Sequence, residues 1–193
     1  MSGLTGSPAD RRATLTAALR VLVLAAAALA AVGAIGRAAG LLMLTTTLGP
    51  TAYVVLAHPD TEGAKLRNSV LGHATATACG LACLAVFGLW SHPSVAVTQH
   101  DTWTQIGAQA LSVGVTLLVL TLLGAYHPPA AATALLITSG IAKPGPQLYG
   151  MLAGLALLIA GAALLAKVPG ARTRARDDGQ ASAGRGDREG REG

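Results

Sequence analysis

Apolar runs separated by short polar segments divide the chain. The runs cover residues 15–35, 38–57, 69–90, 106–126, 130–142 and 148–166. Most of them are about 19–22 residues long, which lets an α-helix cross a hydrocarbon core of about 30 Å. Because Ala and Leu dominate and hardly alternate with polar residues, the runs indicate helices rather than the strands of a barrel. The pattern therefore predicts an all-α, polytopic helical membrane protein.

Two of the runs differ from a plain spanning helix. Residues 38–57 are interrupted by Gly49-Pro50, and residues 130–142 follow directly on His127-Pro128-Pro129. The second of these runs makes only about 20 Å of helix. We expect about six crossings, namely five full-length or kinked helices and one short half-helix.

Composition narrows the class of protein. Charged residues make up 12% of the chain, against about 25% in soluble domains. All nine acidic residues lie outside the apolar runs, and aromatic residues are only 3%. The chain therefore does not read as a soluble enzyme, and it lacks the aromatic platforms of a nucleic-acid binder. We expect no metal and no cofactor.

The positions of Lys and Arg predict the topology. If every run crosses and the N-terminus is inside, only Arg37 and Lys143 of the 14 basic residues fall outside. Residues 91–105 contain no Lys or Arg and become an external loop. The positive-inside rule then favours a multi-pass protein of the cell (inner or plasma) membrane with both termini in the cytoplasm.

The chain divides into three parts on this reading. Residues 1–14 form a cytoplasmic N-terminal segment, residues 15–168 the transmembrane domain, and residues 169–193 a charged cytoplasmic tail that we expect to be disordered. Arg11-Arg12 before the first run also suits a cleaved signal peptide. The long apolar core and the further spans favour an uncleaved first helix.

The two halves of the chain share a pattern. Each half has a full helix, a proline-interrupted segment and another full helix, with LGPTAYVVL and HPPAAATALL at the interruptions. Three crossings per half would invert one half relative to the other, as in transporters whose broken helices mark a midplane site. The alternative is that two proline kinks occur by chance in an Ala-rich bundle.

The segment after His127 has the chemistry of an anion site. Pro128 and Pro129 suit the first turn of a helix, so the amides of Ala131, Ala132 and Thr133 would point out of its positive end. The alternative is a helix start that caps itself. His73 is a further polar group at membrane depth and is equally compatible with packing. The hydroxyls near Thr51 form another polar cluster, although Ser and Thr in membrane helices most often bond back to their own helix. We do not expect Cys79 and Cys83, on one helix face, to form a disulfide.

These residues also carry a family resemblance. HPPAAATAL at residues 127–135 closely resembles the signature of the HPP family of integral membrane proteins. Arg67-Asn68 followed by Gly72-His73 resembles a second family motif, and Gly49 with Ala52 a third. The chain departs from the family pattern at Pro50, Leu66, Leu71 and Ala131. The resemblance implies a small multi-spanning protein, commonly described with four helices, and a link to nitrite transport in plastid and cyanobacterial members.

We therefore expect a transporter or channel for a small inorganic anion such as nitrite, and not an enzyme. The candidate substrate-binding residues are His127, Pro128, Pro129, Ala131, Ala132, Thr133, Arg67, Asn68, His73, Gly49 and Thr51. A haem held between His73 and His127 is a weaker alternative. The rival hypothesis is a membrane scaffold or partner subunit that transports nothing. The expected partners are the lipid bilayer and the anion, but no nucleic acid, and the sequence leaves a homo-oligomer open.

Overall fold

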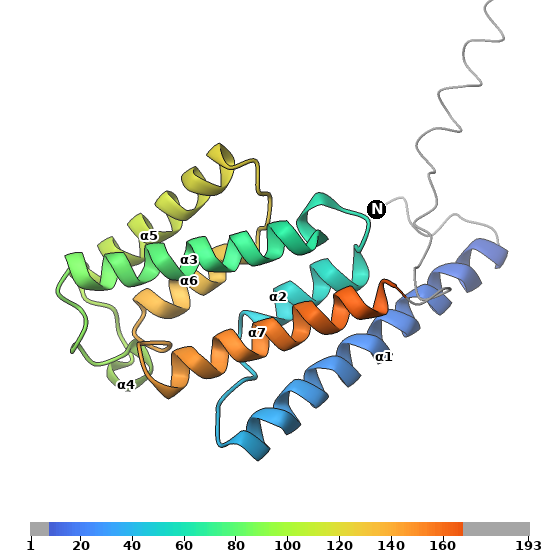
Figure 1. Ribbon diagram of the computed structural model, residues 1–193, viewed down its shortest axis with the longest axis horizontal. Helices are drawn as coiled ribbons and strands as arrows, with labels where there is room; N and C mark the ends of the chain where they lie inside the picture. The colour runs from blue at the N-terminus through green and yellow to red at the C-terminus, as the bar shows by residue number, and fades with distance from the viewer. Residues whose placement is uncertain (1–7, 168–193) are drawn as a thin grey trace, which may run out of the picture.

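The computed structural model describes residues 8–167, and all regular structure in that range is helical (Figure 1). The tail expected from residue 169 onward lies outside the described residues. The elements in chain order are α1 (Pro8–Ala39), α2 (Leu48–Ala52), the π-helical turn η1 (Tyr53–Ala57), the 3-10 turn η2 (Glu62–Ala64), α3 (Leu66–Val86), α4 (Val95–Thr98), α5 (Trp103–Leu122), α6 (Ala130–Thr138) and α7 (Pro146–Leu165). The all-α prediction is confirmed.

Four helices in the described range are long and apolar enough to span a membrane. They are Arg11–Ala39 within α1, and α3, α5 and α7. The α6 helix has nine residues, or about 14 Å, and the continuous helix Leu48–Ala57 reaches only about 15 Å. Helix length therefore supports four spans, and the expected count of about six crossings is not confirmed.

The helices pack in two groups. One group joins α1, α2–η1 and α7, and the other joins α3, α5 and α6 (Figure 1). The last long helix of the first half, α3, thus packs mainly against the second half of the chain, and the last long helix of the second half, α7, packs mainly against the first. The long helix α3 contacts α6, and α7 contacts α2.

Two glycines of α7 allow a close approach to the non-helical chain before α2. A Cβ at Gly150 would lie 2.4 Å from the Leu42 carbonyl oxygen, and one at Gly154 would lie 2.4 Å from that of Met43. No side chain fits at such distances, so the absence of a Cβ permits this contact between helix and backbone. Carbonyl oxygens that meet a glycine Cα in this way also form weak C–H···O contacts.

The interruption of the second apolar run lies earlier than the sequence predicted. Gly49 and Pro50 are inside α2, where Pro50 occupies the first turn and no donor is required of it. The chain is instead non-helical at residues 41–47. Among the described residues, the amides of residues 42–47 have no hydrogen-bond partner, whereas the amide of Leu41 donates to Gly36.

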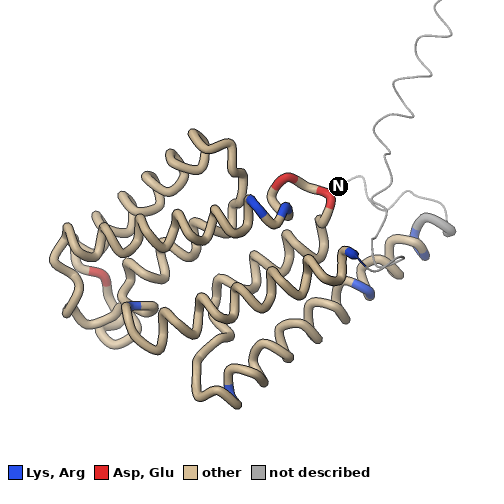
Figure 2. The backbone as a smooth tube through the Cα atoms, in the orientation of Figure 1, with Lys and Arg blue, Asp and Glu red and all other residues tan. Residues whose placement is uncertain are grey.

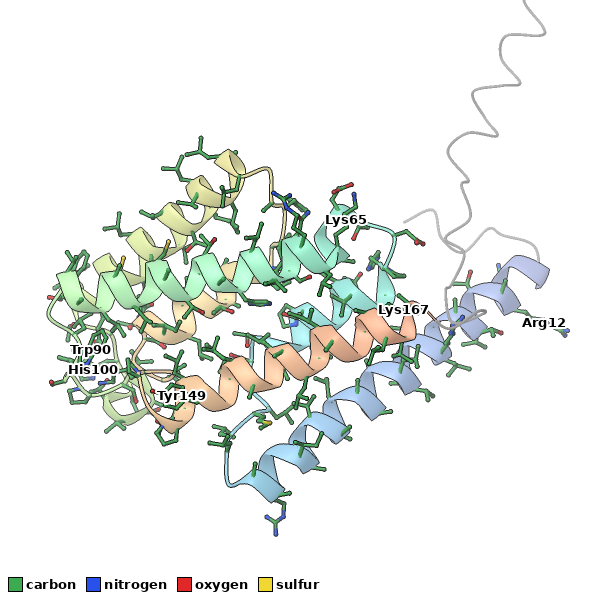
Figure 3. All side chains as sticks on the ribbon, viewed as in Figure 1. Arg12, Lys65, Trp90, His100, Tyr149 and Lys167 are labelled. Atoms are coloured by element: carbon green, nitrogen blue, oxygen red, sulfur yellow. The ribbon has the colours of Figure 1, made fainter. Side chains whose placement is uncertain are left out.

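Apart from Arg20, which lies within α1, the charged residues of the described chain lie in the loops and at or near the helix ends (Figure 2). Arg12, Lys65 and Lys167 lie toward one end of the bundle, whereas Trp90, His100 and Tyr149 lie toward the other (Figure 3). The long axis of the bundle therefore has a basic end and an end that carries the loop between α3 and α5.

Candidate functional site

Four buried polar residues meet inside the bundle. His73 comes from α3, Thr51 from α2, Thr133 from α6, and His127 from the segment before α6. Each is no more than 4% exposed. We call these four residues the histidine cluster. It joins two broken segments of the chain, the first leading into α2 and the second leading into α6, to the full-length helix α3.

Direct hydrogen bonds connect the members of the histidine cluster. The Nε2 atoms of His73 and His127 lie 3.1 Å apart, and the two rings meet edge to face. The other ring nitrogen of His73, Nδ1, is 2.8 Å from Thr133 Oγ1. The Oγ1 atom of Thr51 is 3.1 Å from His73 Nε2 and donates its own proton to the Thr47 carbonyl. His73 is therefore the centre of the network.

His127 is anchored on its far side by backbone. Its Nδ1 atom lies 2.7 Å from the Gly63 carbonyl oxygen in η2. Asn68 holds this turn in place, because its side chain donates to the Glu62 carbonyl at 2.9 Å. A Cβ at Gly72 would lie 2.8 Å from atoms of the His127 side chain. The glycine before His73 is thus the residue that lets the two histidines meet.

The structure brings together four residues that the sequence singled out, namely His73, His127, Thr51 and Thr133. Sequence reasoning missed Ser69, whose buried Oγ lies 3.4 Å from both His127 Nδ1 and the Gly63 carbonyl oxygen. Its position one helical turn before His73 is a signal that would have found it, because residues four apart share a helix face.

The remaining candidate residues are not members of the histidine cluster, and they differ in burial. Asn68 and Pro129 are buried, and Asn68 acts on the turn that carries Gly63. Arg67, Gly49 and Pro128 are exposed. Within the described chain, Arg67 makes no hydrogen bond or ion pair with the histidine cluster.

Two of the three amides expected to hold an anion, those of Ala131 and Ala132, are not free. They donate to the carbonyls of Pro128 and Pro129 at 3.2 Å, and the amide of Ala130 donates to that of His127 at 3.1 Å. The prediction of free amides at Ala131 and Ala132 is therefore wrong, because this helix begins with a tight turn that satisfies its own donors. What the start of α6 contributes to the cluster is the Thr133 hydroxyl.

Every buried side-chain nitrogen and oxygen in the described range has a hydrogen-bond partner. The same range contains no group of three or more residues suited to a metal ion, and Cys79 and Cys83 are free thiols. A haem held between His73 and His127 would need its iron between two imidazole nitrogens, and here those nitrogens contact each other directly at 3.1 Å. The haem alternative therefore does not fit this arrangement.

A cavity of about 490 Å³ opens beside the histidine cluster. It lies between the last turns of α5 and the segment before α6, and its lining includes Thr121, Tyr126 and His127. His127 thus faces the Gly63 turn on one side and this cavity on another.

Four apolar helices of spanning length, together with a buried polar centre where two broken segments meet, define a polytopic helical membrane protein. The chain matches the family model described as HPP, transmembrane region, over residues 10–175. It therefore belongs to this family, as its motifs indicated. Comparison with curated proteins finds no match. Comparison with solved structures also finds none.

Proposed function

We propose that the protein is a transporter or channel for a small inorganic anion of the nitrite type, and that the histidine cluster is its binding site. One observation carries the proposal: two histidines from opposite halves of the chain meet in an apolar bundle. Buried ionisable groups in membrane helices are costly, and proteins retain them mostly for function.

The donor chemistry favours an anion over a cation. Imidazole N–H and threonine O–H groups donate hydrogen bonds, and none of the four candidate spans contains Asp or Glu. A metal cation at this depth would have no carboxylate ligand. Nitrite as the particular anion comes from what the family resemblance implies.

We also propose that the two broken segments complete an inverted repeat with about six crossings and cytoplasmic termini in the cell membrane. The exchanged packing of α3 on α6 and of α7 on α2 supports this arrangement. The collection of Arg12, Lys65 and Lys167 at one end supports a cytoplasmic assignment of that end (Figure 3).

A scaffold role is the second candidate, because the complete pairing of the buried polar atoms is also what a packing network requires. We propose no enzymatic activity. Nitrite uptake separates the two candidates. Purified protein is reconstituted into vesicles, and uptake is compared with protein-free vesicles and with the His127→Ala variant.

We expect uptake above the protein-free level, inhibited by anions of similar size, and lost in His127→Ala. His100→Ala is the matched control, since His100 is exposed in the loop between α3 and α5, where its Nδ1 atom bonds to the Thr98 carbonyl. Wild-type uptake equal to that of protein-free vesicles would favour the scaffold.

A further inference from the structure

We infer that the histidine cluster binds one proton and no more, and that this proton travels with the anion. Proton binding stands on geometry alone, whereas co-transport rests on the proposed function.

The partners assign one tautomer to each neutral ring. His127 Nδ1 faces a carbonyl oxygen, which only accepts, so Nδ1 carries the hydrogen and Nε2 is an acceptor. His73 Nε2 must then carry a hydrogen and donate to His127 Nε2. His73 Nδ1 is left as the acceptor for the Thr133 hydroxyl. The Thr51 oxygen next to His73 Nε2 is compatible with a hydrogen on that nitrogen, because the hydroxyl hydrogen of Thr51 is already donated to the Thr47 carbonyl.

One added proton fits this network, and within it only the Thr133 hydroxyl hydrogen gives up its acceptor. It binds at His73 Nδ1, and the Thr133 hydroxyl rotates so that its oxygen accepts the new N–H. The resulting imidazolium donates to Thr133 on one side and to His127 on the other. The charge is shared along the His73–His127 bond, since the proton between the two Nε2 atoms can sit on either.

A second proton does not fit. It would have to bind at His127 Nε2, which then would face the Nε2 hydrogen of His73 across 3.1 Å. The hydrogen bond between the rings would be replaced by two opposed hydrogens, and two positive charges would meet in an apolar interior. The pair therefore has a capacity of one proton.

No other charge in the described chain neutralises this proton. The titratable groups on the surrounding elements and their connecting loops are Tyr53, His58, Asp60, Glu62, Lys65, Arg67, Cys79, Cys83, Tyr126, Tyr149 and Lys167. Glu62 is paired with Lys65, and in the described range none of these groups bonds to either imidazole. The α5 and α6 helices contain no titratable residue. The added charge thus calls for a mobile counter-ion.

Protonation also releases a donor for that counter-ion. Once His73 Nδ1 carries a hydrogen, the Thr133 hydroxyl hydrogen is free to turn toward a bound anion. The proton and the anion therefore favour each other's binding, and their joint movement carries no net charge. This predicts a ratio of one proton to one anion.

Histidine nitrogen NMR on the full chain in nanodiscs tests proton binding directly. The other histidines are His58, His92 and His100, and the variants His73→Gln and His127→Gln assign the two signals. We expect the Nε2–H tautomer at His73, the Nδ1–H tautomer at His127, and one proton taken up by the pair while circular dichroism shows the fold intact. Opposite tautomers, two protons, or none in the folded protein would each overturn the inference.

Vesicles with a trapped pH indicator test co-transport. We expect one proton to enter with each nitrite, after subtraction of protein-free vesicles, and no response to an imposed membrane potential. Thr133→Val should abolish the coupling. Thr77→Val is the control, because Thr77 bonds only to the backbone of its own helix. Nitrite entry that carries net charge would overturn co-transport, whereas no nitrite entry would overturn the proposed function and leave proton binding to the NMR result.

Discussion

The two broken segments of the chain resemble each other in sequence and differ in how their backbones are held. Before α2, the amides of residues 42–47 have no partner in the described chain, and the carbonyls of Leu42 and Met43 lie against glycines of α7. At the start of α6, the amides of residues 130–132 bond to preceding carbonyls, and His127 just before the helix is anchored to Gly63. The first break depends on steric fit and the second on polar partners.

This difference shows that a proline beside a helix of small residues does not decide which backbone groups a break leaves without a hydrogen-bond partner. Pro50 lies within the first turn of α2, whereas Pro128 and Pro129 form the tight turn before α6. Unpartnered backbone is tolerated at membrane depth only where protein or water covers it. The open backbone therefore lies in the break that the HPP signature does not mark.

The largest expected effect concerns whether each broken segment carries the chain across the membrane. After replacement of Cys79 and Cys83 by Ser, single cysteines are placed at Ala39, Thr61, Leu123 or Ile141, all exposed positions. An impermeant maleimide added outside should label the Ala39 and Ile141 positions and spare the other two. Inverted vesicles should give the opposite result. Labelling of both members of a pair, 39 with 61 or 123 with 141, from the same side would mean a re-entrant segment.

Gly150→Ala should produce the largest loss of stability, because its Cβ meets a backbone oxygen that has little freedom to move. We expect a cost near the upper end of the 1–3 kcal/mol that overpacking causes. Gly161→Ala in the same helix is the matched control, since nothing lies within 4 Å of its added Cβ. Thermal unfolding of the purified variants measures both. Equal stability of the two variants would show that the first break does not depend on this fit.

Gly72→Ala should act on the second break through its anchor. The new methyl group overlaps His127, which must shift away from His73 or from Gly63. A buried donor left without its partner costs about 1–3 kcal/mol, so we expect destabilisation in that range together with loss of the NMR signature of the pair. Gly114→Ala on α5, where the Cβ meets open space, should leave the signature intact. An unchanged pair in Gly72→Ala would contradict this account.

The smallest expected effect on stability is that of Thr133. Thr133→Val removes the hydroxyl that donates to His73 Nδ1 and should cost about 1 kcal/mol, the usual net value of one hydrogen bond. Thr133→Ser keeps the hydroxyl and should retain most of the stability. Denaturation of the two variants side by side checks this, and a Val variant as stable as the Ser variant would show that the bond contributes little.

Much of the fold follows from local pattern. Runs of apolar residues predict helices, because the membrane leaves the backbone no other open-ended structure that satisfies its donors. The α3, α5 and α7 helices accordingly lie close to the expected runs. The position of the first break did not follow from pattern, since residues 41–47 belong to an apolar run, as the spanning helices do. They differ from those helices mainly in their contact with Gly150 and Gly154.

The sequence by itself determined the membrane class, the family motifs and the list of polar residues at membrane depth. Only the tertiary structure decided which of them meet. His73 and His127 are 54 residues apart, and His127 pairs with a carbonyl 64 residues away. Periodicity shows which residues lie on the same side of one helix, but it does not show which other helix that side will contact. Every residue has the same backbone carbonyl, so the identity of Gly63 in the sequence does not indicate that it is the partner of His127.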